Sequence, residues 1–199
     1  YNSPFESRTD CTWAESVPEA FAAVASLQQD LAGLPAPVLG VDVECFGDVV
    51  CTVQLSTPKR DVVLDGLRLH GVLQSALGEL FHNAKVVKVF HAPKNDLWWL
   101  RTNFGLDVKN LFDTATAARE LELAASPAGR GVDCNPSLKA LCREHLGVEL
   151  DKTFQCADWR LRPLPEEMLR YAAADSRLLL PLALRLAGLL AAAGRFELC

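Results

Sequence analysis

Between residues 38 and 65, three short runs rich in valine are separated by brief turn-forming segments. The runs read VLGVDVE, VVCTVQLST and RDVVLD, with Gly47-Asp48 after the first and Pro58-Lys59 after the second. β-Branched runs of this length, bounded by such dipeptides, are typical of strands joined by hairpins. We therefore expect three neighbouring strands, and the chain must fold around a sheet.

After residue 70, helical and strand patterns alternate along the chain. A helix across Gly71 to Phe81 precedes the strand VVKVFH, and a helix from about Asn95 to Asn103 precedes the strand VKNLFDT. This alternation indicates a parallel extension of the sheet. Helices then dominate, at Ala115 to Leu123, at Ser137 to Leu146, and in a long segment that opens at Pro165-Glu166-Glu167. The pattern predicts an α/β fold with a mixed sheet, three hairpin-connected strands followed by parallel strands, flanked by helices.

Two regions fall outside this alternating pattern. Residues 1–37 are expected to form an N-terminal lead-in segment with one helix around Pro18 to Leu31, packed on a domain formed by residues 38–199. The segment AASPAGRGVDCNP is rich in Gly, Pro, Ser and Asn and predicts a loop. Because the chain begins with Tyr1 rather than methionine, we expect a piece of a longer polypeptide.

Several classes of protein are disfavoured by composition. The apolar run from Leu178 to Ala193 contains Pro181 and Arg185 and is shorter than the ~20 residues that a bilayer requires, so no membrane association is expected. No stretch of the given sequence has the pattern expected of a secretory signal. The cysteines are odd in number and lack a C-x-x-C pair, which indicates reduced thiols rather than a zinc site. They are Cys11, Cys45, Cys51, Cys134, Cys142, Cys156 and Cys199.

The net charge of −5 argues mildly against non-specific binding to nucleic acid, which depends on a basic footprint. Clustered acids that hold divalent cations reverse this expectation locally, because the ions add positive charge where a phosphate would lie.

Asp42 and Glu44 lie two residues apart in an otherwise apolar strand, so both side chains point to the same face. Two acids in that position repel each other, and the pair is costly unless a cation lies between them or water reaches the strand end. A metal site and a solvated strand end are both open from this segment alone.

Two further segments carry candidate functional residues. The strand that ends at His91 is followed by Asp96 early in the next helix, and ligands bind at such strand ends in open α/β sheets. Tyr171 and Asp175 are four residues apart and share one helix face. The alternatives are a structural histidine, a helix-start acid and a surface Tyr–Asp pair. Together, four carboxylates that converge on one place are the oxygen ligands that a pair of hard cations accepts.

In this order and context the motifs VDVE, HAPKND and YAAAD resemble those of the DEDD exonucleases of the ribonuclease D type, in the variant with a tyrosine in the third motif. The resemblance spans about residues 38 to 190. It is strongest to the branch that accompanies the nuclear exosome. The segments that carry it are CTVQLST, KVFHAPKNDLWWL, FGLDVKNLFDT and DKTFQCADWRLRPLPEEMLRYA.

The resemblance implies a ribonuclease H-like domain and a role for each matching residue. Asp42, Glu44 and Asp175 would hold one metal ion, Asp42 would bridge to a second, and Asp96 would support that second ion. Tyr171 would orient the attacking water. The implied cofactors are two divalent cations, Mg²⁺ (or Mn²⁺). The implied substrate is single-stranded RNA, shortened from its 3′ end to nucleoside 5′-monophosphates. The RNA exosome or another RNA-processing assembly is the implied partner, and the nucleus the implied location.

The chain also departs from the branch, which usually has a histidine where Cys45 follows Glu44 and a longer segment before the second strand. This puts substrate contacts near the first strand in doubt, but not the metal ligands. Asp113 of LFDT fits the family pattern, and we interpret it as a structural cap.

His91 and Lys94 are the predicted substrate contacts. The wider set of basic and aromatic candidates consists of Lys88, His91, Lys94, Trp98, Trp99, Trp159, Arg160 and Arg162. Tryptophans at adjacent helix positions cannot share one face, so at least one belongs to the core. The alternative for Arg160 and Arg162 is pairing with Glu166 or Glu167.

Two other functions stay open from the sequence. One is a DNA 3′→5′ exonuclease of the proofreading or Werner type, because no residue visibly detects a 2′-hydroxyl. The other is a catalytically silent paralogue that binds RNA or a partner. Retention of all five expected active-site residues favours an enzyme.

Overall fold

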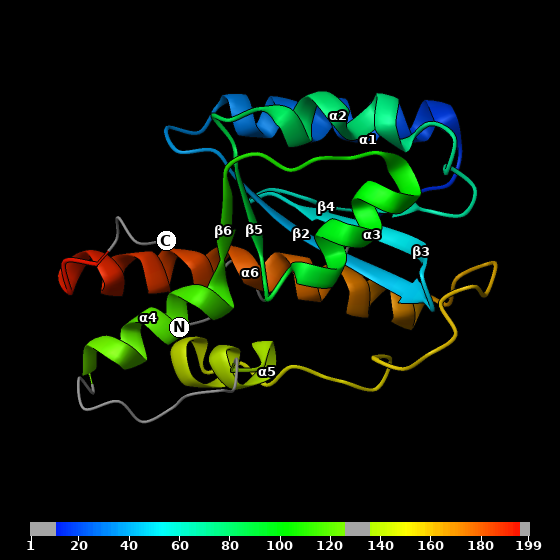
Figure 1. Cartoon of the computed structure of the whole chain (residues 1–199). Coiled ribbons are helices and arrows are strands. Elements are labelled where there is room, and N and C mark those ends of the chain that lie inside the picture. Colours follow the sequence, from blue (N-terminus) through cyan, green and yellow to red (C-terminus); the bar gives the residue numbers. More distant parts are fainter. Residues whose placement is uncertain (1–10, 126–135, 196–199) are drawn as a thin grey trace.

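The computed structural model describes residues 11–125 and 136–195. Figure 1 shows one central sheet, with helices α1 and α2 side by side on one face and the long helix α6 along the other. The elements in chain order are β1 (Thr12–Ala14), α1 (Val17–Ala32), β2 (Val38–Phe46), β3 (Val49–Ser56), β4 (Asp61–Asp65), α2 (Leu73–His82), β5 (Val87–Phe90), α3 (Lys94–Phe104), β6 (Leu111–Asp113), α4 (Thr114–Ala125), α5 (Leu138–Leu141), the π-helix η1 (Cys142–Leu146) and α6 (Glu166–Ala192).

The sheet has the strand order β1-β4-β3-β2-β5-β6. Strands β2, β3 and β4 are antiparallel neighbours, and β5 and β6 extend the sheet in parallel from β2. The predicted mixed sheet is therefore confirmed. The sequence pattern missed β1, a strand of three residues in the lead-in that pairs in parallel with β4. The domain boundary at residue 37 stays a prediction.

The sheet separates the core into two layers, and the residues of β2 point alternately into one layer and the other. Val41 and Val43 point toward α1 and α2 and belong to the larger apolar cluster. The alternate residues of β2 face α6, which packs so closely that a Cβ on Gly40 would lie 2.1 Å from the carbonyl oxygen of Ser176. Only glycine permits this approach, and the approach brings the middle of α6 next to Asp42.

The helical region after α4 differs partly from the prediction. The predicted helix from Ser137 to Leu146 begins as expected, since the hydroxyl of Ser137 accepts a hydrogen bond from the backbone N–H of Ala140. It is divided, however, into the short α5 and the π-helix η1. The predicted loop AASPAGRGVDCNP lies mostly outside the described residues.

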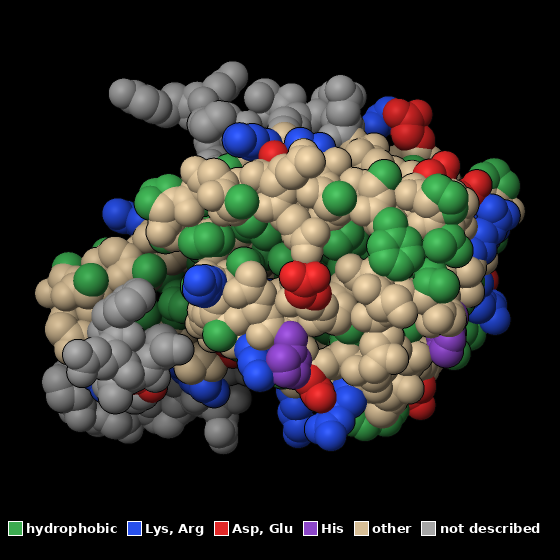
Figure 2. All heavy atoms as spheres, turned by 90° about the horizontal axis from the view of Figure 1, so that it is seen from above, with side chains coloured by type: hydrophobic (Ala, Val, Ile, Leu, Met, Phe, Trp, Pro, Cys, Tyr) green, Lys and Arg blue, Asp and Glu red, His purple; other side chains and the backbone are tan. Residues whose placement is uncertain are grey.

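The outer surface over α1 and α2 carries mixed charge. Figure 2 shows basic and acidic side chains interspersed on this face, without a continuous basic field in the part that is visible. Among the described residues, no helix has the length and apolar character needed to span a bilayer.

Candidate active site

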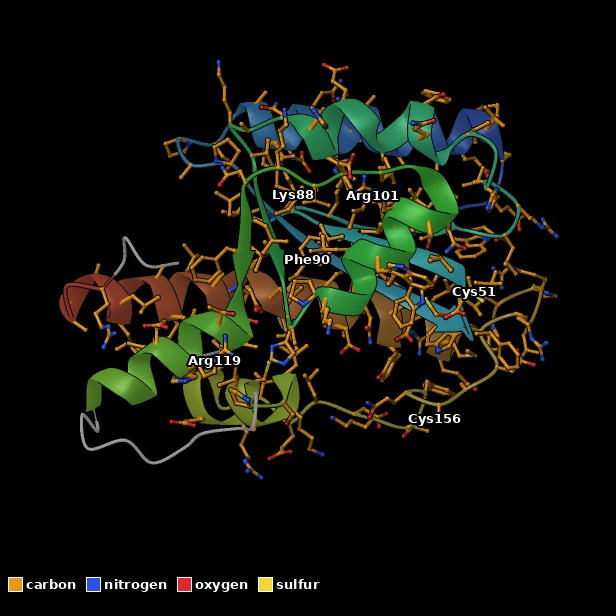
Figure 3. The ribbon with its side chains drawn as sticks, in the orientation of Figure 1. Cys51, Lys88, Phe90, Arg101, Arg119 and Cys156 are labelled. Atoms are coloured by element: carbon orange, nitrogen blue, oxygen red, sulfur yellow. The ribbon has the colours of Figure 1, made fainter. Side chains whose placement is uncertain are left out.

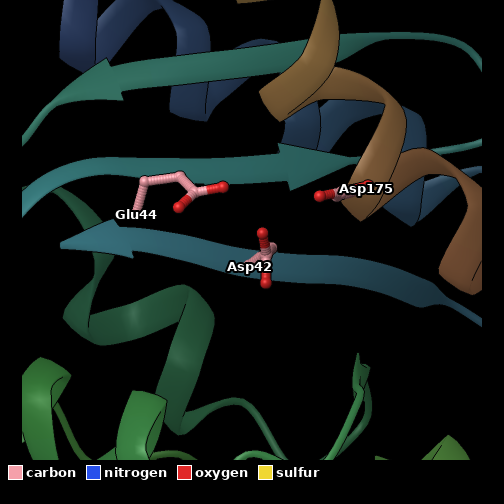
Figure 4. A group of neighbouring side chains, drawn as sticks. All are labelled: Asp42, Glu44 and Asp175. Atoms are coloured by element: carbon pink, nitrogen blue, oxygen red, sulfur yellow. The ribbon is translucent and has the colours of Figure 1, made fainter. Parts of the chain in front are cut away.

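Three carboxylates gather where β2 meets α6. One oxygen from each of Asp42, Glu44 and Asp175 lies within 4.8 Å of the other two. Figure 4 shows the two β2 side chains and the α6 side chain directed into a shared space. Strand alternation puts Asp42 and Glu44 on one face, and the close approach at Gly40 supplies the third acid from α6.

The proximity of these acids has a clear electrostatic cost. Burial, followed by the charges of Glu44 and Asp175, holds the pKa of Asp42 well above its usual range. Burial and the neighbouring carboxylates raise the pKa of Glu44 to about 9, and burial raises the pKa of Asp175 to about 7. Such a group of oxygen donors is costly without a counter-charge and suits a hard divalent cation.

Asp96 lies beside this group rather than within it. It occupies the first turn of α3, where burial raises its pKa to about 6. Its charge in turn raises the pKa values of Asp42 and Glu44. The structure therefore brings three of the four predicted acids within 4.8 Å of one another and places the fourth close enough for its charge to raise the pKa of two of them.

Tyr171 lies one helical turn before Asp175, and the proximity of its hydroxyl lowers the pKa of the Asp175 carboxyl, opposing the effect of burial. Its ring packs against two other aromatic rings, with centroid distances of 5.8 Å to Phe154 and 6.0 Å to Trp159. Burial and the charges of Asp175 and Glu44 raise the pKa of the phenol. The hydroxyl is thus protonated at neutral pH, which suits orientation of a water molecule better than removal of a proton.

A cavity of about 300 Å³ opens beside the acids. It is bounded by β2, α5, α6 and the segment that follows η1, and His91 lies in its wall. Two basic side chains in this wall, Lys139 and Lys152, were not singled out from the sequence. The charge of Lys152 lowers the pKa of Asp175, opposing the effect of burial. No local sequence signal marks these lysines, because the folding of a distant segment against β2 places them there.

The two predicted substrate contacts differ in their relation to the cavity. The Nδ1 atom of His91 lies 2.9 Å from the hydroxyl oxygen of Thr114, and its ring lines the cavity. Lys94 is exposed at the start of α3 and is not among the described residues that line the cavity.

Lys88 is not available as a substrate contact. Figure 3 shows it in the layer between the sheet and α2. It is fully buried, and its ammonium group donates to the carbonyl oxygens of Asn83 and Val86 at 2.8 Å each. Its inclusion in the wider candidate set was wrong, because an alternating pattern does not reveal that a long side chain bends back to backbone acceptors.

The other basic and aromatic candidates lie in different environments. Trp99 packs against the core, whereas the side chain of Trp98 is half-exposed. Arg160 pairs with Asp158, and Arg162 pairs with Asp65. The alternative that these arginines pair with Glu166 or Glu167 was therefore wrong.

Comparison with known proteins assigns the chain to a family. Residues 20–191 match a protein family described as 3′-5′ exonuclease. The chain belongs to this family. Exonucleases of this family depend on divalent metal ions, in agreement with the carboxylate group at β2 and α6.

Curated relatives of this exonuclease-family chain include exosome proteins. Exosome complex component 10 of Rattus norvegicus is 44% identical over 135 residues, which cover 68% of this chain and 14% of that protein. Exosome complex exonuclease RRP6 of Saccharomyces cerevisiae is 34% identical over 177 residues, covering 85% of this chain and 22% of that protein. The chain thus spans less than a quarter of the length of either relative.

Solved structures confirm the ribonuclease H-like fold. The catalytic core of RRP6 from Trypanosoma brucei superposes with a TM-score of 0.80 at 31% identity and covers 94% of this chain and 48% of that one. Escherichia coli RNase D superposes with a TM-score of 0.78 at 24% identity and covers 93% of this chain and 46% of that one. The resemblance inferred from the three motifs is therefore confirmed.

Proposed function

We propose that this chain is a metal-dependent 3′→5′ exoribonuclease domain that shortens single-stranded RNA to nucleoside 5′-monophosphates. The observation that carries the proposal is the convergence of Asp42, Glu44 and Asp175 beside a cavity of about 300 Å³. A cluster of raised pKa values in a cavity is typical of a functional site.

The carboxylates are the proposed metal ligands. Asp42, Glu44 and Asp175 would hold one divalent ion, with Asp42 shared with a second ion that Asp96 supports. We propose Mg²⁺, with Mn²⁺ as a substitute, because both prefer carboxylate oxygens. A pair of such ions supplies activation of the attacking water and stabilisation of the leaving oxygen of a phosphodiester.

The other residues of the site would bind and orient the substrate. Tyr171, held by its aromatic neighbours Phe154 and Trp159, would direct the attacking water through its hydroxyl. His91 in the cavity wall and Lys94 at the start of α3 are the proposed substrate contacts. We add Lys152, whose ammonium group in the cavity wall suits a phosphate.

The proposed substrate and partner rest on the relatives. Exosome proteins are among the curated relatives, and an RNase D of Trypanosoma brucei in complex with RNA U12 is among the structural neighbours, with a TM-score of 0.72 at 24% identity. They support single-stranded RNA as the substrate and the RNA exosome, or another RNA-processing assembly, as the partner. A nuclear location follows from that assignment.

The proposal is tested with a 5′-labelled single-stranded RNA, Mg²⁺ or Mn²⁺, and a DNA strand of the same sequence. We expect a ladder that shortens from the 3′ side, proceeds faster on RNA and stops when a chelator is added. Asp96→Asn and Tyr171→Phe should each slow the ladder strongly. Asp107→Asn, an exposed acid paired with Arg101, is the matched control and should not change it.

Each contrary outcome has a distinct meaning. Faster degradation of DNA would favour the DNA exonuclease. Absence of degradation of either strand would favour the catalytically silent paralogue. An undiminished ladder in Asp96→Asn would contradict the assignment of the site.

A further inference from the structure

Phe46 ends β2 in an unusual position for an aromatic residue. It lies two residues beyond Glu44, past an irregularity in the β2–β3 register between Glu44 and Cys45. Cys45 packs against the same cluster as Val41 and Val43, so Phe46 is directed to the other face of the strand, with Glu44. Two strand residues span about 7 Å. Phe46 is nevertheless 44% exposed, so an exposed aromatic ring lies at the end of the strand that carries the acids.

One partner of this ring is a guanidinium group. The Cζ atom of Arg160 lies 3.5 Å from the centroid of the Phe46 ring, which is stacking distance. The guanidinium is fixed from the side, because its Nε and one terminal nitrogen donate to the two carboxylate oxygens of Asp158 at 2.8 Å each. Half of the Arg160 side chain remains exposed. The pair is therefore a preorganised stack of two planar groups, each of which stays partly exposed.

The loop that carries Arg160 is anchored to the sheet. Arg162 donates to both carboxylate oxygens of Asp65 at 2.6 and 2.8 Å and to the carbonyl oxygen of Cys51 at 2.9 Å. Trp159, next to Arg160, is buried. These contacts hold the loop against β3 and β4, so the position of the ring and guanidinium relative to Glu44 is fixed.

The chemistry of the pair selects a particular ligand. The charge of Arg160 is already balanced by the carboxylate of Asp158, so the guanidinium is poorly suited to bind a phosphate group. The ring and the guanidinium are planar, and the charge of Arg160 is balanced by that of Asp158, so other planar rings can stack on the pair. Nucleobases meet this requirement, and stacking on aromatic and guanidinium planes is tolerant of base identity.

We propose that Phe46 and Arg160 form a stacking subsite for one base of the nucleic-acid strand whose 3′ end is bound at the carboxylates. The subsite rests on the proposed function, because it assumes a bound strand. Phe46 does not line the cavity beside the acids, so the stacked base belongs to an internal nucleotide rather than to the terminal one.

The test is a mutant cycle between the protein and the strand. The 199-residue chain carries Asp175→Asn in every sample, so that the probe is not degraded. Dissociation constants are measured by fluorescence anisotropy for an RNA oligonucleotide and for derivatives with a single abasic nucleotide at successive positions from the 3′ end. We expect Phe46→Ala to weaken binding of the intact strand about tenfold.

Direct stacking makes the two changes non-additive. At one position, or at two adjacent positions, the abasic nucleotide should weaken binding about tenfold when Phe46 is present. In Phe46→Ala the same abasic strand should bind no more weakly than the intact strand. Phe21→Ala is the matched control, since Phe21 is 45% exposed on α1 and lies on the opposite face of the sheet. Should Phe46→Ala fold poorly, Phe46→Leu keeps an apolar side chain and removes the ring.

Equal losses on intact and abasic strands at every position would overturn the subsite and leave a structural role for the ring. This outcome is independent of the proposed function. If the unmodified protein degrades RNA but no position couples to Phe46, only the subsite fails. If coupling is found and no degradation occurs, the subsite stands and the exoribonuclease proposal fails.

Discussion

Gly40 of β2 lies in such close contact with Ser176 of α6 that a Cβ at position 40 would come within 2.1 Å of the Ser176 carbonyl oxygen. The contact is made by backbone, which cannot move aside as a flexible side chain would. It therefore sets the distance between the strand that carries Asp42 and the helix that carries Asp175.

Gly40→Ala should consequently disrupt both stability and metal binding. We expect a loss of at least about 2 kcal/mol in the free energy of unfolding, because α6 must shift to relieve the overlap. The affinity for Mn²⁺, measured by calorimetry, should fall in the same variant. Gly78→Ala in α2 is the matched control, since a Cβ there meets no atom within 4 Å. It should stabilise the helix by about 0.5–1 kcal/mol. Unchanged Mn²⁺ affinity in Gly40→Ala would contradict this account.

The sequence contained most of the local information about the site and little of the long-range information. Alternation along β2 predicted that Asp42 and Glu44 share a face, and helical spacing predicted the same for Tyr171 and Asp175. Their convergence depends on the packing of α6 against Gly40, which no short window of sequence reveals. Only the family resemblance supplied it.

The errors in the fold have similar causes. Strand β1 has three residues, too few for a pattern, and its partner β4 lies far along the chain. The region from Ser137 to Leu146 has helical periodicity, but periodicity does not distinguish a continuous α-helix from α5 followed by a π-helix. Long-range pairing and the exact form of a short helix are tertiary effects.

The metal-free protein should lose stability as the pH rises. Folding raises the pKa of Glu44 to about 9 and that of Asp175 to about 7, so the folded state binds more protons than the unfolded state at intermediate pH. The stabilisation from protonation is complete below the unfolded values, near pH 4, and is lost as the pH rises through 7 and 9. Thermal unfolding in a chelator should show a melting temperature that falls over this range.

Two comparisons isolate the origin of this pH effect. Glu44→Gln removes one titrating group and should flatten the upper part of the profile. A divalent ion neutralises the carboxylates and should restore stability at high pH in the original protein but much less in the variant. A metal-free melting temperature that rises steadily between pH 5 and 9 would be incompatible with the buried acid cluster.

Asp113 is expected to act as a positioning residue for the turn that precedes α3. One of its carboxylate oxygens accepts hydrogen bonds from the backbone N–H groups of Ala92 at 2.8 Å and Ala115 at 3.0 Å, and the other from the Thr116 hydroxyl at 2.7 Å. The interpretation of Asp113 as a structural cap is thus confirmed. Ala92 has a φ of 51°, a conformation that is unfavourable for alanine. The bond to Asp113 holds this strained turn four residues before Asp96.

Asp113→Ala should therefore lower stability by about 1–2 kcal/mol and weaken Mn²⁺ binding as the turn relaxes. Adding Ala92→Gly should recover part of both losses, because glycine adopts the same backbone conformation without strain. Chemical denaturation and calorimetry measure the two effects. Rescue of stability without rescue of Mn²⁺ binding would show that the turn does not position Asp96.

Lys152 should contribute to substrate binding through charge alone. Its side chain lies in the cavity wall next to the acids, and its charge already lowers the pKa of Asp175. A phosphate contact by one lysine contributes a salt-dependent term to affinity that does not depend on sequence. Lys152→Gln should weaken RNA binding similarly for every sequence and reduce the magnitude of the slope of log K against log salt concentration by about 1.

The matched control is Lys85→Gln, because Lys85 is an exposed lysine beside the groove between α1 and α2, and this variant should leave the slope unchanged. An unchanged slope in Lys152→Gln would mean that this lysine tunes the carboxylates without contacting the strand, because a bound phosphate must release counterions when the lysine neutralises it.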